Sequence, residues 1–236
     1  MNGAVYVSAW SAWSPGIRTN EEWAEWAAGE RELSATGEVP PLEHVDAMFK
    51  RRLSQLTRMT IQVGHEALKG QRPMKICFAS AYGEISQQYK ITSRLIEERE
   101  VSPANFSLSV FNTPVAALSI VEGNTEGYVA CYPGLDAFRL ALVESAAALR
   151  AGDGTSRLLI VADELMPAEY VPLQNGINQP YALALVLSSE PGPGRIELRE
   201  EDFRANDPAD AANTDAKMPD ALRFLRDRIL KASRPL

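Results

Sequence analysis

The stretch that most constrains the fold is residues 105–152, where an extended segment passes through the turn Pro133-Gly134 into a helical run. Between positions 135 and 152 nearly all side chains are apolar, and the run is interrupted only by Asp136, Arg139, Glu144, Ser145 and Arg150. A helix that is apolar on nearly every side has to be covered by protein, so we expect it to be buried at the centre of the molecule. Its N-terminus would point at a functional site, and a cysteine there would indicate an enzyme.

Short apolar runs elsewhere predict the strands of a sheet. They lie at residues 4–9, 75–80, 128–132, 158–162 and 181–187, and the alternating run 195–199 is typical of an edge strand. Helices are predicted by apolar spacing at 51–70, 87–100 and 219–231, and by the capping pattern that begins at Asn20. No break in composition suggests a linker, so residues 1–236 are expected to form a single α/β domain. Within it, we expect a mobile loop at 206–217 and a terminal helix at 218–234.

Composition and charge exclude several classes of function. The net charge is −7, and no cluster of Lys and Arg interleaved with aromatic residues points to nucleic acid. No apolar run approaches the ~20 residues that span a bilayer, and no basic region followed by an apolar stretch marks a leader. We therefore expect a cytoplasmic protein without a membrane span. No Gly-x-Gly-x-x-Gly follows a predicted strand, which argues against a dinucleotide cofactor.

The chain offers few residues for metal or thiol chemistry. His44 and His65 are far apart and lack a His-x-x-x-His spacing, so no metal site is expected. Cys77 and Cys131 lack a Cys-x-x-Cys spacing, which favours buried free thiols over a disulfide or a zinc site. The acidic pair at 163–164 has no general-acid partner or metal spacing, and we interpret it as two loop carboxylates.

Six short motifs, in their order and spacing, resemble the β-ketoacyl synthases of the thiolase fold. More closely, they resemble the short ketosynthase-like proteins that act as chain length factors in aryl-polyene biosynthesis. The motifs are Arg-Arg-Leu-Ser-Gln-Leu-Thr-Arg at 51–58, Tyr-Gly-Glu at 82–84, Phe-Ser-Leu-Ser-Val-Phe-Asn at 106–112, Leu-Ser-Ile at 118–120, Gly-Asn at 123–124 and Gly-Asp at 152–153. This resemblance implies half of a ketosynthase fold, with a mixed sheet and a buried central helix.

In that family a cysteine thiolate at a helix N-terminus attacks an acyl thioester, and two histidines assist the reaction. The histidines belong to a C-terminal half that we do not expect here, because residues 191–236 contain no histidine. The sequence Ala-Cys-Tyr-Pro-Gly at 130–134 imitates the family's Ala-Cys-x-x-Gly. Counting twelve residues on from Gly123, or seventeen back from Gly152, nevertheless places the nucleophile position at Leu135. Leucine cannot attack, so no catalytic residue is expected, and Cys131 is the runner-up thiol.

The resemblance also implies a partner. Ketosynthases dimerise through the strand before the nucleophile helix, which here contains Tyr128, Val129, Ala130, Cys131 and Tyr132. An exposed apolar edge strand is a liability, so we expect a heterodimer with an active ketosynthase. This chain would supply the opposing wall of the acyl tunnel, and the bulk of the wall would limit product length. The expected wall residues are Phe111, Leu135 and Phe138.

An acyl carrier protein would meet the complex on the partner's side, because the carrier and this chain are both acidic. No cofactor is expected, since a ketosynthase substrate carries its electrophile as a thioester. Two alternatives stay open. One is a stand-alone acyl-transfer or condensing enzyme that uses Cys131 as its nucleophile, which predicts a depressed pKa for that thiol. The other is a purely structural subunit that stabilises its partner.

Overall fold

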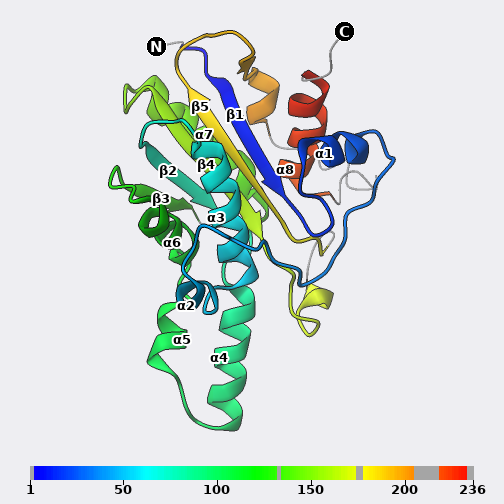
Figure 1. The fold of residues 1–236 in the computed structure, drawn as a ribbon, viewed down its shortest axis with the longest axis vertical. Helices are drawn as coiled ribbons and strands as arrows, with labels where there is room; N and C mark the ends of the chain where they lie inside the picture. Colours follow the sequence, from blue (N-terminus) through cyan, green and yellow to red (C-terminus); the bar gives the residue numbers. More distant parts are fainter. Residues whose placement is uncertain (1–2, 132–133, 174–177, 205–217, 233–236) are drawn as a thin grey trace.

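The computed structural model of the chain describes residues 3–131, 134–173, 178–204 and 218–232. Six strands form one mixed sheet in the order β3-β2-β4-β5-β1-β6 (Figure 1). The strands are β1 (Tyr6–Trp13), β2 (Lys75–Ala79), β3 (Tyr128–Cys131), β4 (Ser156–Asp163), β5 (Tyr181–Ser188) and β6 (Ile196–Glu197). Strands β3, β2 and β4 run parallel, whereas β4, β5, β1 and β6 pair in antiparallel fashion. The expected α/β class with a mixed sheet is confirmed.

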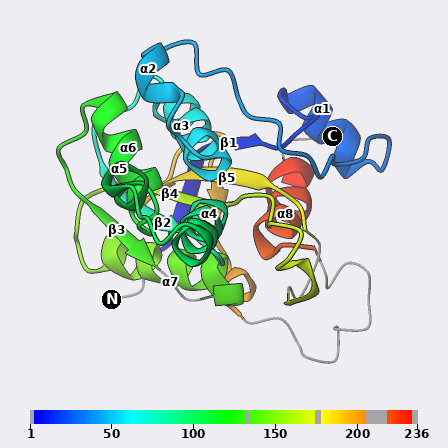
Figure 2. The ribbon, with the colours of Figure 1, turned by 90° about the horizontal axis from the view of Figure 1, so that it is seen from below.

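Helices cover both faces of the sheet, as the end-on view shows (Figure 2). One face carries α3 (Gln55–Leu68) and α6 (Thr113–Glu122). The other carries α7 (Ala137–Arg150), α1 (Asn20–Ala27) and α8 (Asp220–Phe224), and α8 continues into the π-helical segment η6 (Leu225–Leu230). The shorter elements are α2 (Ala47–Lys50), η1 (Gly134–Asp136), η2 (Val171–Leu173) and η3 (Glu200–Phe203).

The two central strands explain why both faces need cover. Every residue of β5 is buried, as is every residue of β4 after Ser156. Side chains alternate along a strand, so Leu158 and Ile160 enter the core under α3 while Leu159 and Val161 enter the core under α7. A continuous apolar run therefore corresponds to a strand that is covered twice.

The buried central helix is α3, although the sequence assigned that place to the helix after β3. In α7 the side chains of Leu140 and Val143 are each 38% exposed, because this helix lies on one face of the sheet. In α3, by contrast, eight of the twelve residues from Leu56 to Ala67 are buried, between the sheet, α6 and the segment around Leu42. The apolar run 135–152 is rich in alanine, whose small side chain makes the run apolar but leaves little surface that has to be buried.

The part of residues 105–152 that was expected to be extended contains two helices instead. Helix α5 (Pro103–Ser107) begins with Ser102, whose hydroxyl accepts a hydrogen bond from Asn105 N. Helix α6 has Pro114 in its first turn and ends at Gly123 in the left-handed conformation. The predicted terminal helix is formed by α8 and η6, while the loop expected at 206–217 lies outside the described residues.

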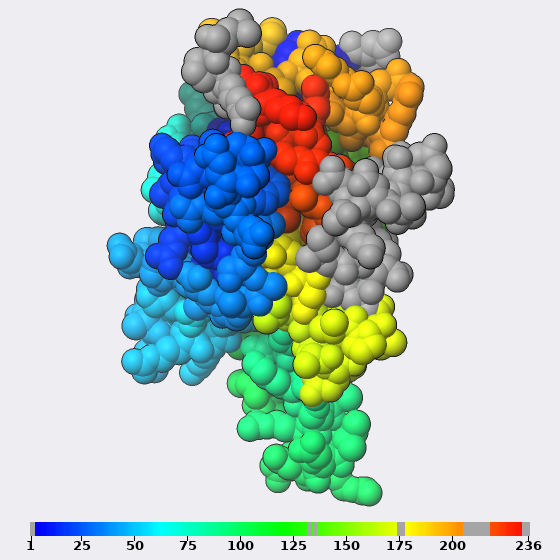
Figure 3. Space-filling model, turned by 90° about the vertical axis from the view of Figure 1, so that its right-hand side faces the viewer, coloured from blue at the N-terminus to red at the C-terminus, as the bar shows by residue number. Residues whose placement is uncertain are grey.

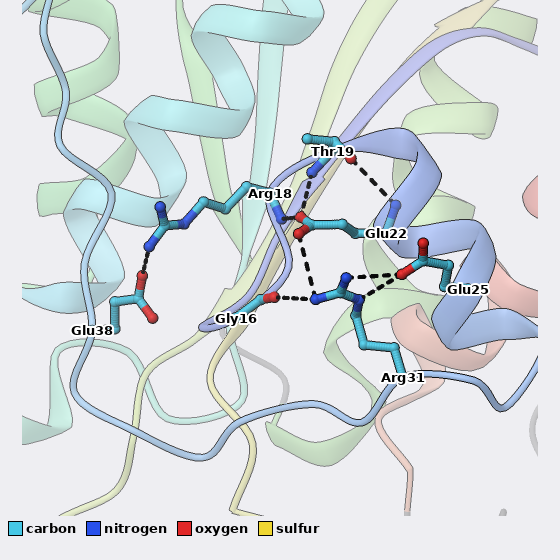
Figure 4. Close-up of polar contacts among 7 residues, drawn as sticks. All are labelled: Gly16, Arg18, Thr19, Glu22, Glu25, Arg31 and Glu38. Atoms are coloured by element: carbon cyan, nitrogen blue, oxygen red, sulfur yellow. Dashed lines mark hydrogen bonds and ion pairs between the residues drawn. The ribbon is translucent and has the colours of Figure 1, made fainter.

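A polar network fixes α1 at the edge of the molecule (Figure 4). Thr19 Oγ1 accepts a hydrogen bond from Glu22 N, and the Glu22 carboxylate accepts one from Thr19 N, which completes a capping box. Arg31 bonds Glu25 and the Gly16 carbonyl, closing the turn beneath the helix. The inner face of α1 is thereby held against the sheet, where its two tryptophans are buried.

One arm projects from the body of the molecule (Figures 1 and 3). It consists of α4 (Ile85–Glu97), α5 and their connection, and neither helix has a buried residue. Its exposed apolar side chains are Leu95, Ile96, Val101 and Phe106. Within the described part of the chain, no helix combines the length and hydropathy that a membrane span requires.

Candidate functional site

The carboxyl ends of three parallel strands meet at one edge of the sheet, which we call the carboxyl edge. Strand β2 ends there at Ala79, β3 at Cys131 and β4 at Asp163. The turn η1 and then α7 follow β3, so the N-terminus of α7 also lies at this edge. Leu135, the position expected for a nucleophile, belongs to η1, and its side chain lies outside the described part of the structure.

Cys131 and Cys77 form a pair of thiols on the α7 side of the sheet. Their sulfur atoms are 3.8 Å apart, and Cys77 Sγ also lies 3.9 Å from the Ala141 carbonyl oxygen. The Cys77 thiol hydrogen-bonds the Cys131 sulfur, which lowers the pKa of Cys131 to about 7 and, with burial, raises that of Cys77. Both thiols are free, as predicted, but only Cys77 is fully buried.

Asp163 is the buried last residue of β4, so the interpretation of it as a loop carboxylate is wrong. Its Oδ1 accepts hydrogen bonds from Ser80 Oγ at 2.8 Å and Ala81 N at 2.7 Å, and its Oδ2 accepts one from Tyr181 Oη at 3.0 Å. Burial raises the pKa of Asp163 above its ordinary value, and the hydrogen bonds from these donors oppose that rise only in part. The carboxylate therefore holds the loop after β2 against β4 and β5. Its sequence signal, an acidic residue directly after a buried strand, does not distinguish this role from an exposed loop.

Two more carboxyl groups are buried where α3 and α4 begin. Glu84 Oε1 accepts hydrogen bonds from Thr57 Oγ1 at 2.5 Å and Ser54 Oγ at 2.8 Å, while Glu164 Oε1 accepts one from Ser86 N at 2.9 Å. Burial and the neighbouring Glu164 raise the pKa of Glu84 to about 8. Glu164 lies in the loop that follows β4, as predicted, but it is only 6% exposed there. Glu84 belongs to the Tyr-Gly-Glu motif, so its position was visible in the sequence although its burial was not.

Phe111 and Phe138 both border the carboxyl edge, but they approach it from opposite faces of the sheet. The Phe111 ring packs near Phe78, with 5.8 Å between centroids, and lies directly over Gly83. A Cβ atom at Gly83 would lie 2.7 Å from this ring, so only glycine fits. The Phe138 ring is 6% exposed and lies 5.2 Å from the ring of Phe224 in α8.

Strand β3 forms the outer edge of the sheet beside these residues. Tyr128 and Val129 are 39% and 40% exposed, Ala130 and Cys131 are half-buried, and Tyr132 lies outside the described residues. Asn112 Nδ2 donates a hydrogen bond to Tyr128 Oη at 3.0 Å, which links the start of α6 to the edge. Helices α6 and α7 flank the strand and carry further exposed apolar residues: Ile120, Leu140 and Val143.

The two histidines lie together, contrary to their separation in the sequence. The rings of His44 and His65 stack with 3.7 Å between centroids, and His65 Nδ1 lies 2.9 Å from Glu122 Oε1. Burial and the neighbouring His65 lower the pKa of His44. Asn124 Nδ2 bonds the Met74 carbonyl just before β2, so this cluster lies near the amino end of that strand. Cys131 ends its strand at the opposite edge, and the structure therefore does not bring histidine and Cys131 together.

Comparisons with known proteins agree with this fold. Residues 23–234 match the family model of the β-ketoacyl synthase N-terminal domain. The structure of the ketosynthase ApeO in complex with its chain length factor ApeC, from Xenorhabdus doucetiae, is similar at 26% identity and a TM-score of 0.70, covering 81% of each chain. No curated protein matches the sequence.

More distant structures share the fold alone. The ishigamide ketosynthase/chain length factor matches at 16% identity and a TM-score of 0.64, covering 83% of this chain and 65% of its own. A β-ketoacyl synthase from Burkholderia phymatum STM815 matches at 13% identity and a TM-score of 0.62, covering 79% of this chain and 59% of its own. The chain thus has the thiolase-like ketosynthase fold at a length that spans about two thirds or less of these two relatives.

Proposed function

Because the chain belongs to the β-ketoacyl synthase N-terminal domain family, we propose that it is a non-catalytic chain length factor. In this role it forms a heterodimer with an active ketosynthase and shapes the acyl tunnel of that enzyme in the cytoplasmic synthesis of polyene or fatty-acid-type chains. The similarity to a ketosynthase in complex with its chain length factor supports the proposal. The observation that carries it is the edge strand β3, which is exposed, apolar and flanked by apolar helix residues.

The edge strand favours a partner on physical grounds. An exposed edge presents unpaired backbone N–H and C=O groups, and monomeric proteins usually shield such strands with charges or a covering loop. Strand β3 has no charged residue. Its own Val129 is 40% exposed, and Ile120 of the flanking helix α6 is 72% exposed. A second sheet that paired with β3 would satisfy the backbone groups and cover the apolar side chains in one step.

The arrangement at the carboxyl edge supports a non-catalytic role. Leucine occupies position 135, in the turn that opens α7, and a leucine side chain offers neither a nucleophile nor a proton. Both histidines lie near the amino end of β2, where they cannot assist a reaction at Cys131. An active ketosynthase would have to supply the thiolate and the histidines, and it would also receive the acyl carrier protein.

Co-purification tests the heterodimer. The variant Val129→Lys places a charge on the exposed part of β3, and we expect it to lose its ketosynthase partner in size-exclusion chromatography. Glu197→Lys changes an exposed residue of β6, the strand at the opposite edge, and serves as the matched control. Wild type and control should elute as a complex with the ketosynthase. Equal complex formation by all three chains would refute pairing through β3.

Product length tests the tunnel wall formed by Phe111, Leu135 and Phe138. Phe111→Ala removes a ring that is only half-buried at the carboxyl edge, so we expect the reconstituted complex to release longer acyl chains. Phe138→Ala should act in the same direction, but it also removes the contact with Phe224 and destabilises the chain. Unchanged product lengths at normal yield, in both variants, would favour the purely structural subunit.

One observation favours the second candidate function, an acyl-transfer enzyme that uses Cys131. The pKa of this thiol is lowered to about 7, so a substantial fraction is thiolate at neutral pH. If Cys131 is the nucleophile, the isolated chain should form an acyl-enzyme with an acyl thioester, and Cys131→Ala should abolish it. If the chain is a chain length factor, mass spectrometry should find no acyl adduct, and Cys131→Ala should leave the activity of the complex unchanged.

A further inference from the structure

The only two histidines of the chain meet a glutamate at one place on the surface. His44 comes from the turn before α2, His65 from α3 and Glu122 from the last turn of α6. Their ligand atoms all lie within 4.8 Å of one another, and the side chains of His65 and Glu122 are 26% and 18% exposed. Three separate segments thus direct imidazole and carboxylate groups to a shared point.

The close crossing of α3 and α6 accounts for the pair formed by His65 and Glu122. At the crossing, a Cβ atom on Gly64 would lie 2.5 Å from Leu118 Cδ2, so the two helices approach as closely as glycine allows. His65 follows Gly64 directly, and Glu122 lies one helical turn beyond Leu118. The distance of 2.9 Å between His65 Nδ1 and Glu122 Oε1 follows from this packing.

His44 is held at the cluster by the turn that carries it. Leu42 and Val45, on either side, are 0% and 7% exposed and are part of the core around α3. Leu42 also has a φ of 48°, a conformation that leucine rarely adopts, and Lys50 Nζ donates hydrogen bonds to the carbonyls of Pro41 and Leu42. The surrounding structure therefore imposes a strained turn that places an imidazole over α3.

We propose that His44, His65 and Glu122 bind a divalent first-row metal ion, with zinc as the best match. Two imidazoles and one carboxylate are a frequent ligand set for zinc, which leaves a fourth position for water. The ligand atoms of a tetrahedral zinc ion lie about 3.3 Å apart, given bonds of about 2.0–2.2 Å. His65 Nδ1 and Glu122 Oε1, which lie 2.9 Å apart, have to separate slightly to reach this spacing, and the exposed His44 ring has to turn out of its stack to complete the site.

The site is structural, because it lies near the amino end of β2, away from the carboxyl edge. A bound ion would tie the turn at 42–45 to α3 and α6, the layer that covers one face of the sheet. Binding to the folded state alone raises the stability of that state, so the ion should raise the Tm of the chain.

Zinc titration of the full chain, purified without a polyhistidine tag, tests this site. We expect wild type to bind a single zinc ion in isothermal titration calorimetry and to show an increased Tm. His44→Ala and Glu122→Gln each remove one ligand, and each should weaken binding by about tenfold or more. Glu66→Gln is the matched control, since Glu66 lies one residue from His65 but outside the ligand set.

Cobalt gives an independent readout, because tetrahedral Co²⁺ absorbs visible light strongly. A visible band that needs both His44 and Glu122 would support the site. The proposal is overturned if wild type binds no zinc at micromolar concentration, or if the two ligand variants bind zinc as tightly as Glu66→Gln. Circular dichroism of each variant separates loss of the site from loss of the fold.

Discussion

The carboxyl group of Glu84 is buried where α3 and α4 begin, and its ionisation is therefore linked to folding. Its pKa is about 8 in the folded chain, against an ordinary value of 4.5, so the folded state holds an extra proton between these values. The stabilising contribution is complete below pH 4.5 and is lost as the pH rises through 8, by up to about 1.4 kcal/mol per pH unit. We expect the unfolding free energy of Glu84→Gln, from urea titrations, to fall less than that of wild type between pH 6 and 9.

Glutamine keeps an acceptor for Ser54 and Thr57 but cannot lose a proton, so this variant isolates the titration of Glu84. The pKa values of Asp163 and Glu164 are also raised, so these two groups likewise make the unfolding free energy fall as the pH rises. Both groups are present in wild type and in Glu84→Gln. Glu97→Gln, at the exposed end of α4, is the control for a change of surface charge. Parallel pH profiles for wild type and Glu84→Gln would show that Glu84 is already ionised at pH 6.

A second prediction at the scale of single residues concerns Gly64, which lies against Leu118. Gly64→Ala improves helix propensity by about 1 kcal/mol, but its Cβ would lie 2.5 and 2.8 Å from the two Leu118 methyl carbons. Overpacking of a core typically costs about 1–3 kcal/mol, and the neighbouring Ile160 leaves little room to relax. We expect a net loss of up to about 2 kcal/mol in urea unfolding. Leu118→Ala should cost less in the Gly64→Ala background than alone, and strict additivity would contradict the clash.

Single residues also show where inference from the sequence reaches its limit. Counting from two glycines predicts that Leu135 occupies the nucleophile position, because that argument needs only spacing along the chain; this stays a prediction. The meeting of His65 with Glu122 depends instead on how α3 crosses α6, and the position of His44 beside them depends on a strained turn. Neither feature leaves a periodic signal, so the sequence predicted no cluster. The sequence did not predict the burial of Glu84 either, because its partners Ser54 and Thr57 lie at the start of α3, far from Glu84 along the chain.

At the scale of elements, the pattern of apolar residues was sufficient to predict the strands that are covered on both faces. Strands β4 and β5 were predicted within two residues of their bounds because their runs are apolar throughout. Helix α6 was missed although Pro114 in its first turn and Gly123 at its end are ordinary helix signals. Those signals were outweighed by the Ser- and Phe-rich residues before them, which suggested extended chain and include the short helix α5.

The end of α6 gives a prediction about an element. Gly123 has a φ of 61° and closes the helix just after Glu122, and no atom lies within 4 Å of the position that a Cβ atom would take there. Alanine would therefore meet no neighbour but would adopt the left-handed conformation, at a cost of roughly 1–2 kcal/mol. Gly37→Ala is the control, because Gly37 has equal space and an unstrained backbone. Chemical denaturation should show the loss only for Gly123→Ala, and equal stability of the two variants would argue against the left-handed end.

At the scale of the whole molecule, most of the exposed large apolar side chains among the described residues lie beside β3 or on the arm of α4 and α5, and Met48, Val171 and Leu173 lie elsewhere. Arg94 and Arg99 lie near the tip of that arm, and trypsin should cut the free chain there first. If the partner ketosynthase covers both β3 and the arm, these two sites should become protected in the complex. Arg204 is 69% exposed on the β6 side of the molecule and should remain cleavable, which makes it the internal control. Mass spectrometry of the fragments distinguishes the outcomes, and cleavage of the arm at the same rate with and without the ketosynthase would restrict the interface to β3 and its flanking helices.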